Sequence, residues 1–188
     1  MPEPAFTETL QVAIVVRDLD KAVRTYWDDY GIGPWQIYEF NPETVEGMHQ
    51  NGKPVDASWR LALAMVGSLM WELIEPLDDK SDYARFLAEK GEGVHHVAVG
   101  LPSFDGAIEA TRAKGRELVL GGTYNGVEFA YFPTKDDLGV VTEAFRTIPE
   151  GQVPLQDRPP ASKVRKPVPG SAWAQCFGNC WGLFIDLR

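Results

Sequence analysis

The feature of this 188-residue chain that most constrains its fold is an internal repeat. Gln11-Val12-Ala13 recurs as His96-Val97-Ala98, and Trp71-Glu72-Leu73 recurs later as Thr142-Glu143-Ala144. The residues between these runs also correspond in step: Asp20 with Asp105, Ala22 with Ala107, and Val23 with Ile108. Single short matches arise by chance, but matches in the same order indicate a duplicated unit, and a duplicated unit sets the architecture.

Each copy of the repeat has the pattern of a strand, a helix and three further strands. In the first copy we expect strand 11–16, helix 21–30 and strands 35–40, 59–66 and 69–74. In the second copy we expect strand 94–99, helix 104–114 and strands 118–120, 128–132 and 139–145. A long loop is expected over 41–58, and turns are expected at Gly121-Gly122 and Asp136-Asp137.

The sequence therefore predicts an α+β fold, in which tandem βαβββ repeats form a cupped mixed sheet around one site. The expected domain covers 8–148, with halves 8–77 and 92–148. A short helix at 81–90, capped by Ser81, lies between the halves. Prolines crowd into the polar segment that follows, so we expect residues 149–188 to form a Pro-rich tail with an aromatic end.

Composition excludes several classes of partner. The formal net charge of −9 argues against nucleic acid, because phosphate binding needs a basic surface. The longest apolar run, 61–70, is far shorter than the ~20 residues that span a bilayer, and the first residues lack a signal-peptide pattern. We expect a cytoplasmic homodimer that acts on a small molecule, with no nucleic-acid or membrane partner.

The repeat places a potential metal ligand at four equivalent positions. Gln11 and His96 begin the first strand of each copy, and Glu72 and Glu143 lie in a late strand of each copy. If the halves pack about a pseudo-twofold axis, these side chains converge on one point. One imidazole with three oxygen ligands suits one divalent metal ion, which can be Zn²⁺, Mn²⁺, Co²⁺, Ni²⁺ or Fe²⁺.

Ordinary structural roles compete with this interpretation. A strand histidine is more often a hydrogen-bonded core residue, and strand glutamates are usually exposed. Here Glu72 and Glu143 sit inside otherwise apolar strands, and the symmetry supplies a ligand at every equivalent position, which favours a metal site. Because side chains alternate along a strand, His96 should point inward and His95 the opposite way.

Around these residues the chain resembles the vicinal oxygen chelate superfamily, over about residues 8 to 148. The most specific stretch runs through Glu72-Leu73-Ile74-Glu75-Pro76-Leu77, then 81–87, then Gly91-Glu92-Gly93-Val94-His95-His96-Val97-Ala98. It is similar to the methylmalonyl-CoA epimerase branch, which carries "ELLEPL", a short helix and "GEGIHHIA" in this order. The resemblance implies that Glu72, His96 and Glu143 are metal ligands.

The same resemblance implies a reaction, in which a metal-stabilised enolate allows a proton next to a carbonyl to be moved. Glu143 would be both ligand and catalytic base. Asp56 falls near the position of a second catalytic acid, although it is shorter than the glutamate of the family. A solvated loop aspartate is the competing interpretation of Asp56.

Gln11 departs from the epimerase pattern, which usually has histidine there. The set Gln-Glu-His-Glu is instead that of animal-type glyoxalase I. However, Val15 stands where that enzyme has an arginine for glutathione, and Pro76 stands where it has asparagine. Glyoxalase I is therefore not favoured.

Aromatic residues on the expected strands suggest an apolar pocket. The candidates for its lining are Trp35, Trp59, Phe129 and Tyr131, whereas Trp71 should pack under the helices because Glu72 points the other way. Three classes of function stay open. They are an epimerase-like enzyme; a lyase, isomerase or dioxygenase acting on a hydrophobic or aromatic carbonyl compound; and a non-catalytic small-molecule binding protein.

Overall fold

The computed structural model describes residues 5–148, in which ten strands form one sheet. The expected tail at 149–188 lies outside the described residues. The strands are β1 (Thr9–Val15), β2 (Gln36–Phe40), β3 (Val45–Gln50), β4 (Lys53–Pro54), β5 (Trp59–Val66), β6 (Leu69–Pro76), β7 (Gly93–Val99), β8 (Leu120–Tyr124), β9 (Val127–Phe132) and β10 (Val141–Thr147). The helices are α1 (Leu19–Tyr30), α2 (Asp82–Lys90), α3 (Phe104–Ala113) and α4 (Lys135–Leu138).

The sheet contains the expected duplication. The strand order is β2-β5-β6-β1-β7-β10-β9-β8-β3-β4, so each half repeats the same arrangement outward from the centre. β1 pairs in parallel with β6 in the first half, as β7 does with β10 in the second. The halves join where β1 runs antiparallel to β7, with Val12 paired to Val97. This confirms the α+β fold of tandem βαβββ units.

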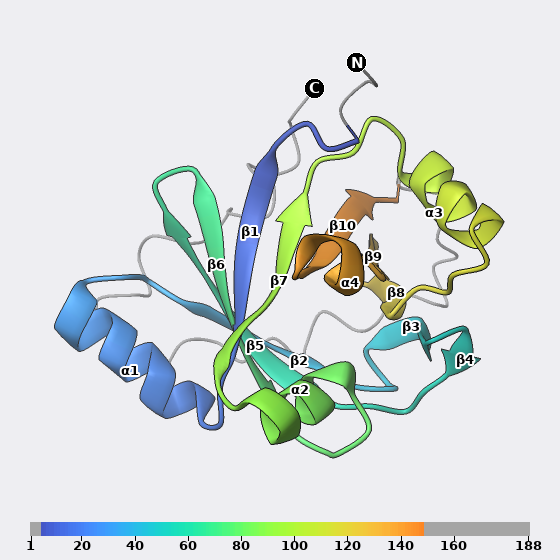
Figure 1. The fold of residues 1–188 in the computed structure, drawn as a ribbon. Coiled ribbons are helices and arrows are strands. Elements are labelled where there is room, and N and C mark those ends of the chain that lie inside the picture. The colour runs from blue at the N-terminus through green and yellow to red at the C-terminus, as the bar shows by residue number, and fades with distance from the viewer. Residues whose placement is uncertain (1–4, 149–188) are drawn as a thin grey trace.

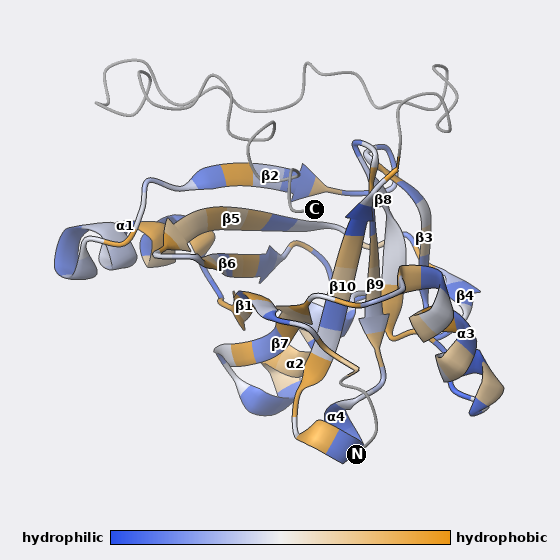
Figure 2. Cartoon of the chain, turned by 90° about the horizontal axis from the view of Figure 1, so that it is seen from above, coloured by the Kyte–Doolittle hydropathy of each residue, from blue (hydrophilic) through white to orange (hydrophobic). Residues whose placement is uncertain are grey.

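The two halves of the sheet form the walls of a cup. Figure 2 shows β2, β5 and β6 as one wall and β10, β9 and β8 as the other, meeting at β1 and β7. In Figure 1, α1 and α3 lie outside these walls, and α2 lies beside the lower end of β7.

Apolar side chains pack on both faces of the sheet. An α1 cluster on one face contains Val16, Leu19, Trp35, Ala62, Ala64 and Leu73, and an α3 cluster contains Leu118, Ala130, Phe132 and Ala144. The opposite face of the same strands carries a central cluster: Ala13, Val15, Tyr38, Val45, Met48, Ala57, Trp59, Leu61, Ile74, Tyr83, Val119, Leu120, Phe129, Tyr131 and Val141. Burying one stripe of each helix and both faces of the strands explains why these strands are almost continuously apolar.

Local capping fixes where the helices begin and end. The Asp18 carboxylate accepts a hydrogen bond from the backbone N–H of Lys21 at the start of α1, and the Ser81 hydroxyl accepts from Ala84 at the start of α2. Gly31 ends α1 with φ +65°, a left-handed conformation that glycine adopts at low cost. None of the helices in residues 5–148 is long and apolar enough to cross a membrane.

The expected loop at 41–58 is wrong in part, because it contains β3 and β4. β3 pairs with β8, so a hairpin from the first half extends the outer edge of the second half. Its buried residues, Val45 and Met48, do not alternate strictly, and the partner strand is distant in the sequence. A pairing of this kind leaves little local signal in the sequence.

The expected turn at Gly121-Gly122 is also wrong, because both residues lie inside β8 and the chain turns at Asn125-Gly126. The glycines serve close packing. A Cβ on Gly121 would lie 2.6 Å from His49 Cε1, and one on Gly122 would lie 2.7 Å from Val45 Cγ1. At Asp136-Asp137 the chain forms the single-turn helix α4.

Candidate metal centre

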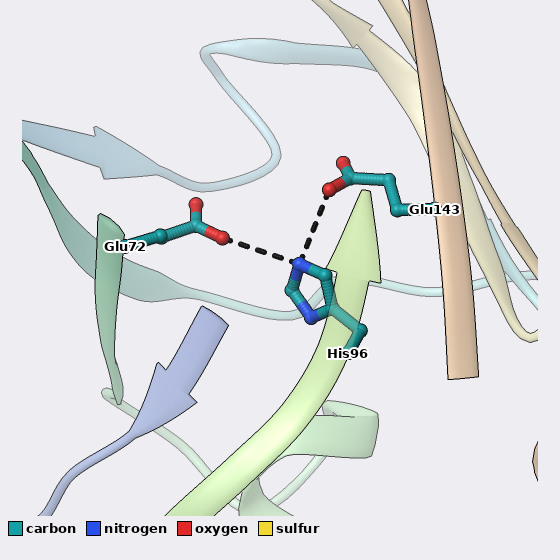
Figure 3. A group of neighbouring side chains, drawn as sticks. All are labelled: Glu72, His96 and Glu143. Atoms are coloured by element: carbon teal, nitrogen blue, oxygen red, sulfur yellow. Dashed lines mark ion pairs between the residues drawn. The ribbon is translucent and has the colours of Figure 1, made fainter. Parts of the chain in front are cut away.

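Three potential ligands from three strands meet on the concave face. Glu72 of β6, His96 of β7 and Glu143 of β10 point toward one another, as Figure 3 shows. His96 Nε2 lies 3.2 Å from Glu72 Oε2 and 3.1 Å from Glu143 Oε2, and the three ligand atoms lie within 4.8 Å of one another. His96 is fully buried, and the two glutamates are 5% and 6% exposed.

Strand register produces this convergence. Ala13 of β1 pairs with Glu72 on one side and with His96 on the other. Glu143 pairs in the equivalent way with Ala98, two residues after His96. The ligand positions are therefore related by the pseudo-twofold axis through the pair Val12 and Val97, as the repeat in the sequence predicts.

Gln11, the fourth predicted ligand, faces the same cluster. It is buried, and its Nε2 donates a hydrogen bond to Glu72 Oε2 at 2.6 Å and lies 3.5 Å from Glu143 Oε2. An amide ligates a metal through oxygen, so ligation by Gln11 requires its side-chain amide to rotate by half a turn. The structure brings Gln11 to the site, with its nitrogen directed inward.

The electrostatics of the cluster are those of a cation site. Burial would lower the pKa of His96, but its hydrogen bonds and charge interactions with Glu143 and Glu72 outweigh burial and raise the pKa to about 9. Burial raises the pKa of Glu143, and the charge of Glu72 adds to that rise. Two carboxylates held together away from water need positive charge beside them.

The donor set fits a divalent metal. It offers one imidazole nitrogen and two carboxylates, with an amide oxygen available from Gln11, and all four side chains are buried at one point. Such a set suits the borderline-hard ions from Mn²⁺ to Zn²⁺. The residues at this point could therefore hold one divalent metal ion.

Tyr131, predicted as a pocket residue, reaches the ligand atoms. Its hydroxyl lies 3.3 Å from His96 Nε2 and accepts a hydrogen bond from the Tyr83 hydroxyl at 2.7 Å. Burial, together with the charge of Glu143, raises the pKa of Tyr131 well above its ordinary value. The hydroxyl therefore stays protonated and can donate a hydrogen bond at the centre.

The other predicted pocket residues divide between the two faces. Trp59 and Phe129 share the central cluster with Tyr131, and Trp59 Nε1 is buried without a partner among residues 5–148. Trp35 instead belongs to the α1 cluster, where its ring centroid lies 5.7 Å from that of Tyr26. Trp35 directly precedes β2, and its indole N–H donates a hydrogen bond to the backbone carbonyl of Ile32 in the segment that follows α1. Trp71 packs beside Tyr26, as expected.

Asp56 is not brought to the metal ligands. It is exposed, in the segment between β4 and β5, and its backbone carbonyl accepts a hydrogen bond from Lys80 Nζ. This position matches the competing interpretation of a solvated loop aspartate.

Sequence reasoning missed the role of His95. The pairing of β1 with β7 shifts register here, with Ala13 opposite His96 and Ile14 opposite Val94, so His95 is the extra residue of a β-bulge. His95 is buried, and its ring approaches those of Tyr83 and Phe86 in α2, each at 5.1 Å between centroids. The bulge depends on the register between β1 and β7, which leaves no local signal in the sequence.

Comparison with known proteins identifies the class. Residues 10–132, more than half of the chain, match the Glyoxalase/Bleomycin resistance protein/Dioxygenase superfamily. The chain belongs to this superfamily, as its fold and its ligand positions indicate. The matched span ends before β10, so the family match does not include Glu143. No curated protein matches the chain significantly.

Several solved structures with a similar fold are methylmalonyl-CoA epimerases. The enzyme from Mycobacterium tuberculosis shares the fold with a TM-score of 0.57 at 24% identity, over 79% of this chain and 93% of that one. A variant of the Streptomyces coelicolor enzyme, in complex with 2-nitronate-propionyl-CoA, has a TM-score of 0.56 at 26% identity, over 76% and 98%. An epimerase in complex with methylmalonyl-CoA and NH4+ gives 0.56 at 27%, over 76% and 95%.

Proposed function

We propose that this protein is a metal-dependent enzyme that moves a proton next to a carbonyl group, as in an epimerase. The observation that carries the proposal is the buried group of Glu72, His96 and Glu143, contributed by both halves of a glyoxalase-like fold. The likeness to methylmalonyl-CoA epimerases at 26–27% identity supports this type of reaction.

The four residues at the pseudo-twofold axis, Gln11, Glu72, His96 and Glu143, would together hold the metal. When bound, the metal supplies positive charge that stabilises negative charge developing on a substrate carbonyl oxygen. Glu143 would take or return the proton at the adjacent carbon, because burial raises the pKa of its carboxyl group and so favours proton uptake.

Tyr131 would assist from the same side. The Tyr83 hydroxyl donates a hydrogen bond to the Tyr131 hydroxyl. The proton of the Tyr131 hydroxyl can therefore be donated to the substrate oxygen. The surrounding Trp59 and Phe129 exclude water, which strengthens each of these interactions.

The proposed substrate class is an acyl-CoA with an acidic C–H next to its thioester. Two similar epimerases are in complex with methylmalonyl-CoA and 2-nitronate-propionyl-CoA, respectively. Asp56 is retained in the proposal only as a second acid that would have to approach from its exposed loop.

Deuterium exchange into the substrate tests the proposed reaction. Purified protein loaded with Mn²⁺, Co²⁺, Ni²⁺ or Zn²⁺ is incubated with methylmalonyl-CoA in D₂O, and exchange at the α-carbon is measured by NMR. We expect exchange with the wild type and none with Glu143→Gln, while circular dichroism shows both folded. The same exchange is measured for Asp56→Asn. A lower exchange rate would indicate that Asp56 is a second acid, and an unchanged rate would indicate that it is a surface residue. Absence of exchange with every metal would contradict the epimerase proposal.

A second candidate is a lyase, isomerase or dioxygenase of the same superfamily that acts on a hydrophobic or aromatic carbonyl compound. The observation in its favour is the aromatic wall of the concave face, where Phe40 stacks on both Trp59 and Tyr124 at centroid distances of 5.3 and 4.1 Å. Exchange in an aromatic ketone, without exchange in methylmalonyl-CoA, would select it. A non-catalytic binding protein would show binding of such a compound without exchange in either substrate.

We further propose that the enzyme is a homodimer in the cytoplasm. Light scattering on the purified protein tests the homodimer. A monomer at micromolar concentration would contradict it.

A further inference from the structure

A chain of buried polar side chains leads away from the metal centre toward α2. His95 Nδ1 lies 3.1 Å from His96 Nδ1, and His95 Nε2 lies 3.0 Å from Asp82 Oδ2. The other carboxylate oxygen of Asp82 pairs with the guanidinium group of Arg85. His95, His96 and Asp82 are all at most 5% exposed, so none of these groups can replace its partner with bulk water.

The donor and acceptor of each hydrogen bond in this chain follow from Asp82. Asp82 can only accept, since Arg85 donates to one oxygen and His95 faces the other. His95 Nε2 therefore carries the proton and His95 Nδ1 is the acceptor. His96 Nδ1 must then donate, which leaves the lone pair of a neutral His96 on Nε2, the nitrogen that faces Glu72 and Glu143.

We infer that Asp82 and His95 are positioning residues that fix the tautomer and ring orientation of His96 for metal binding. The inference rests on the proposed metal centre. Metal-bound histidines usually donate their second N–H to an outer partner, and loss of that partner weakens metal binding. Here the partner is a second histidine, itself held by a buried carboxylate.

The asymmetry of the repeat supports this role. The position equivalent to His95 in the first half is Leu10, which precedes Gln11. An amide ligand has no tautomer to fix, whereas an imidazole has two. The pairing of β1 with β7 shifts register at Leu10 as well as at His95, so the two halves differ in the residue at the bulge and not in the bulge itself. The Asp82 that completes the chain of hydrogen bonds comes from α2, which lies between the two repeats.

The experiment measures metal affinity directly. Co²⁺ and Zn²⁺ dissociation constants are determined by competition with a chromophoric chelator for the wild type, Asp82→Asn and His95→Phe. We expect both variants to bind 10–100-fold more weakly and to alter the visible absorption of the Co²⁺ protein. Phenylalanine keeps a ring between Tyr83 and Phe86, so the packing at His95 is largely preserved.

Ser81→Ala is the matched control. It removes the cap of α2 beside Asp82, so it destabilises the same helix end without touching the chain of hydrogen bonds. We expect a lower Tm with metal affinity within twofold of the wild type. Equal loss of affinity in Ser81→Ala and Asp82→Asn would show a merely structural effect and overturn the inference.

A second measurement needs no variant. The ¹⁵N chemical shifts of the imidazoles in Zn²⁺-loaded wild-type protein should show His96 protonated at Nδ1 and His95 protonated at Nε2. The opposite tautomer at His95 would overturn the inference. If Asp82→Asn and His95→Phe bind metal as tightly as the wild type, and the wild type exchanges deuterium, only the positioning role is contradicted. If the wild type binds no metal, both the positioning role and the proposed function are contradicted.

Discussion

At the scale of single residues, the centre depends on a few buried charges held in contact. Two carboxylates and one imidazole are buried together, and Gln11 donates an amide hydrogen to the Glu72 carboxylate. His96 lies within 3.2 Å of both carboxylates. The ionisation of His96 is therefore linked to the stability of the metal-free protein.

This linkage predicts how stability changes with pH. The folded-state pKa of His96, about 9, lies above its ordinary value of 6.5. Its contribution to stability is fully present below pH 6.5 and is lost as pH rises through 9, a loss on the order of 3 kcal/mol. The raised pKa of Glu143 adds a loss in the same direction that begins at lower pH.

Urea denaturation of EDTA-treated protein between pH 6 and 10 measures this loss. We expect the free energy of unfolding to fall across the range, and to fall much less in His96→Gln. A wild-type stability that is constant or rises over this range would contradict the assignment.

Tyr131 gives a second prediction at this scale. In Tyr131→Phe the ring remains in the central cluster but the donor is lost. We expect turnover to fall by roughly 10²–10³-fold, as when one hydrogen-bond donor to a developing oxyanion is removed. KM should change little. Steady-state kinetics with the substrate identified by deuterium exchange would check this, and a change confined to KM would assign Tyr131 to binding alone.

At the scale of elements, the sequence predicted the strands and helices that have a local pattern of apolar residues. The repeat and the apolar runs predicted the strands holding Glu72, His96 and Glu143, and strand periodicity predicted that these side chains share a face. The bulge at His95 could not be predicted, because it depends on the register between β1 and β7. The contact of Asp82 with His95 depends in turn on where α2 docks.

The glycine pair in β8 shows the same limit. Two adjacent glycines are typical of a turn, yet here they admit β3 close against the sheet. We expect Gly122→Ala to destabilise the protein by about 1–3 kcal/mol, because its Cβ meets the branched, buried side chain of Val45.

Gly121→Ala is the comparison, and it should cost less, because the His49 imidazole that it meets can move aside. Thermal or urea denaturation of the two variants, and of Gly122→Ala combined with Val45→Ala, measures the difference. Equal tolerance of alanine at both positions would contradict close packing in β8.

At the scale of the whole molecule, duplication explains both the fold and the site. Each half supplies one candidate ligand from its first strand and one from its last, so the centre forms only where the halves meet at β1 and β7. A bound metal would therefore join the halves and stabilise the folded state by an amount that rises with the logarithm of its free concentration relative to Kd. Substrate identity depends on pocket shape rather than on this symmetry, which is why the repeat predicted the centre more fully than the substrate.

The central claim is that one divalent metal binds between the two halves at these residues. The most direct test is anomalous diffraction at the metal edge from crystals of Mn²⁺-, Co²⁺- or Zn²⁺-loaded protein. We expect one strong peak per chain, bonded to Glu72, His96 and Glu143, and we expect the double variant Glu72→Gln, Glu143→Gln to lose it. A peak elsewhere, or density without an anomalous signal at this point, would contradict it.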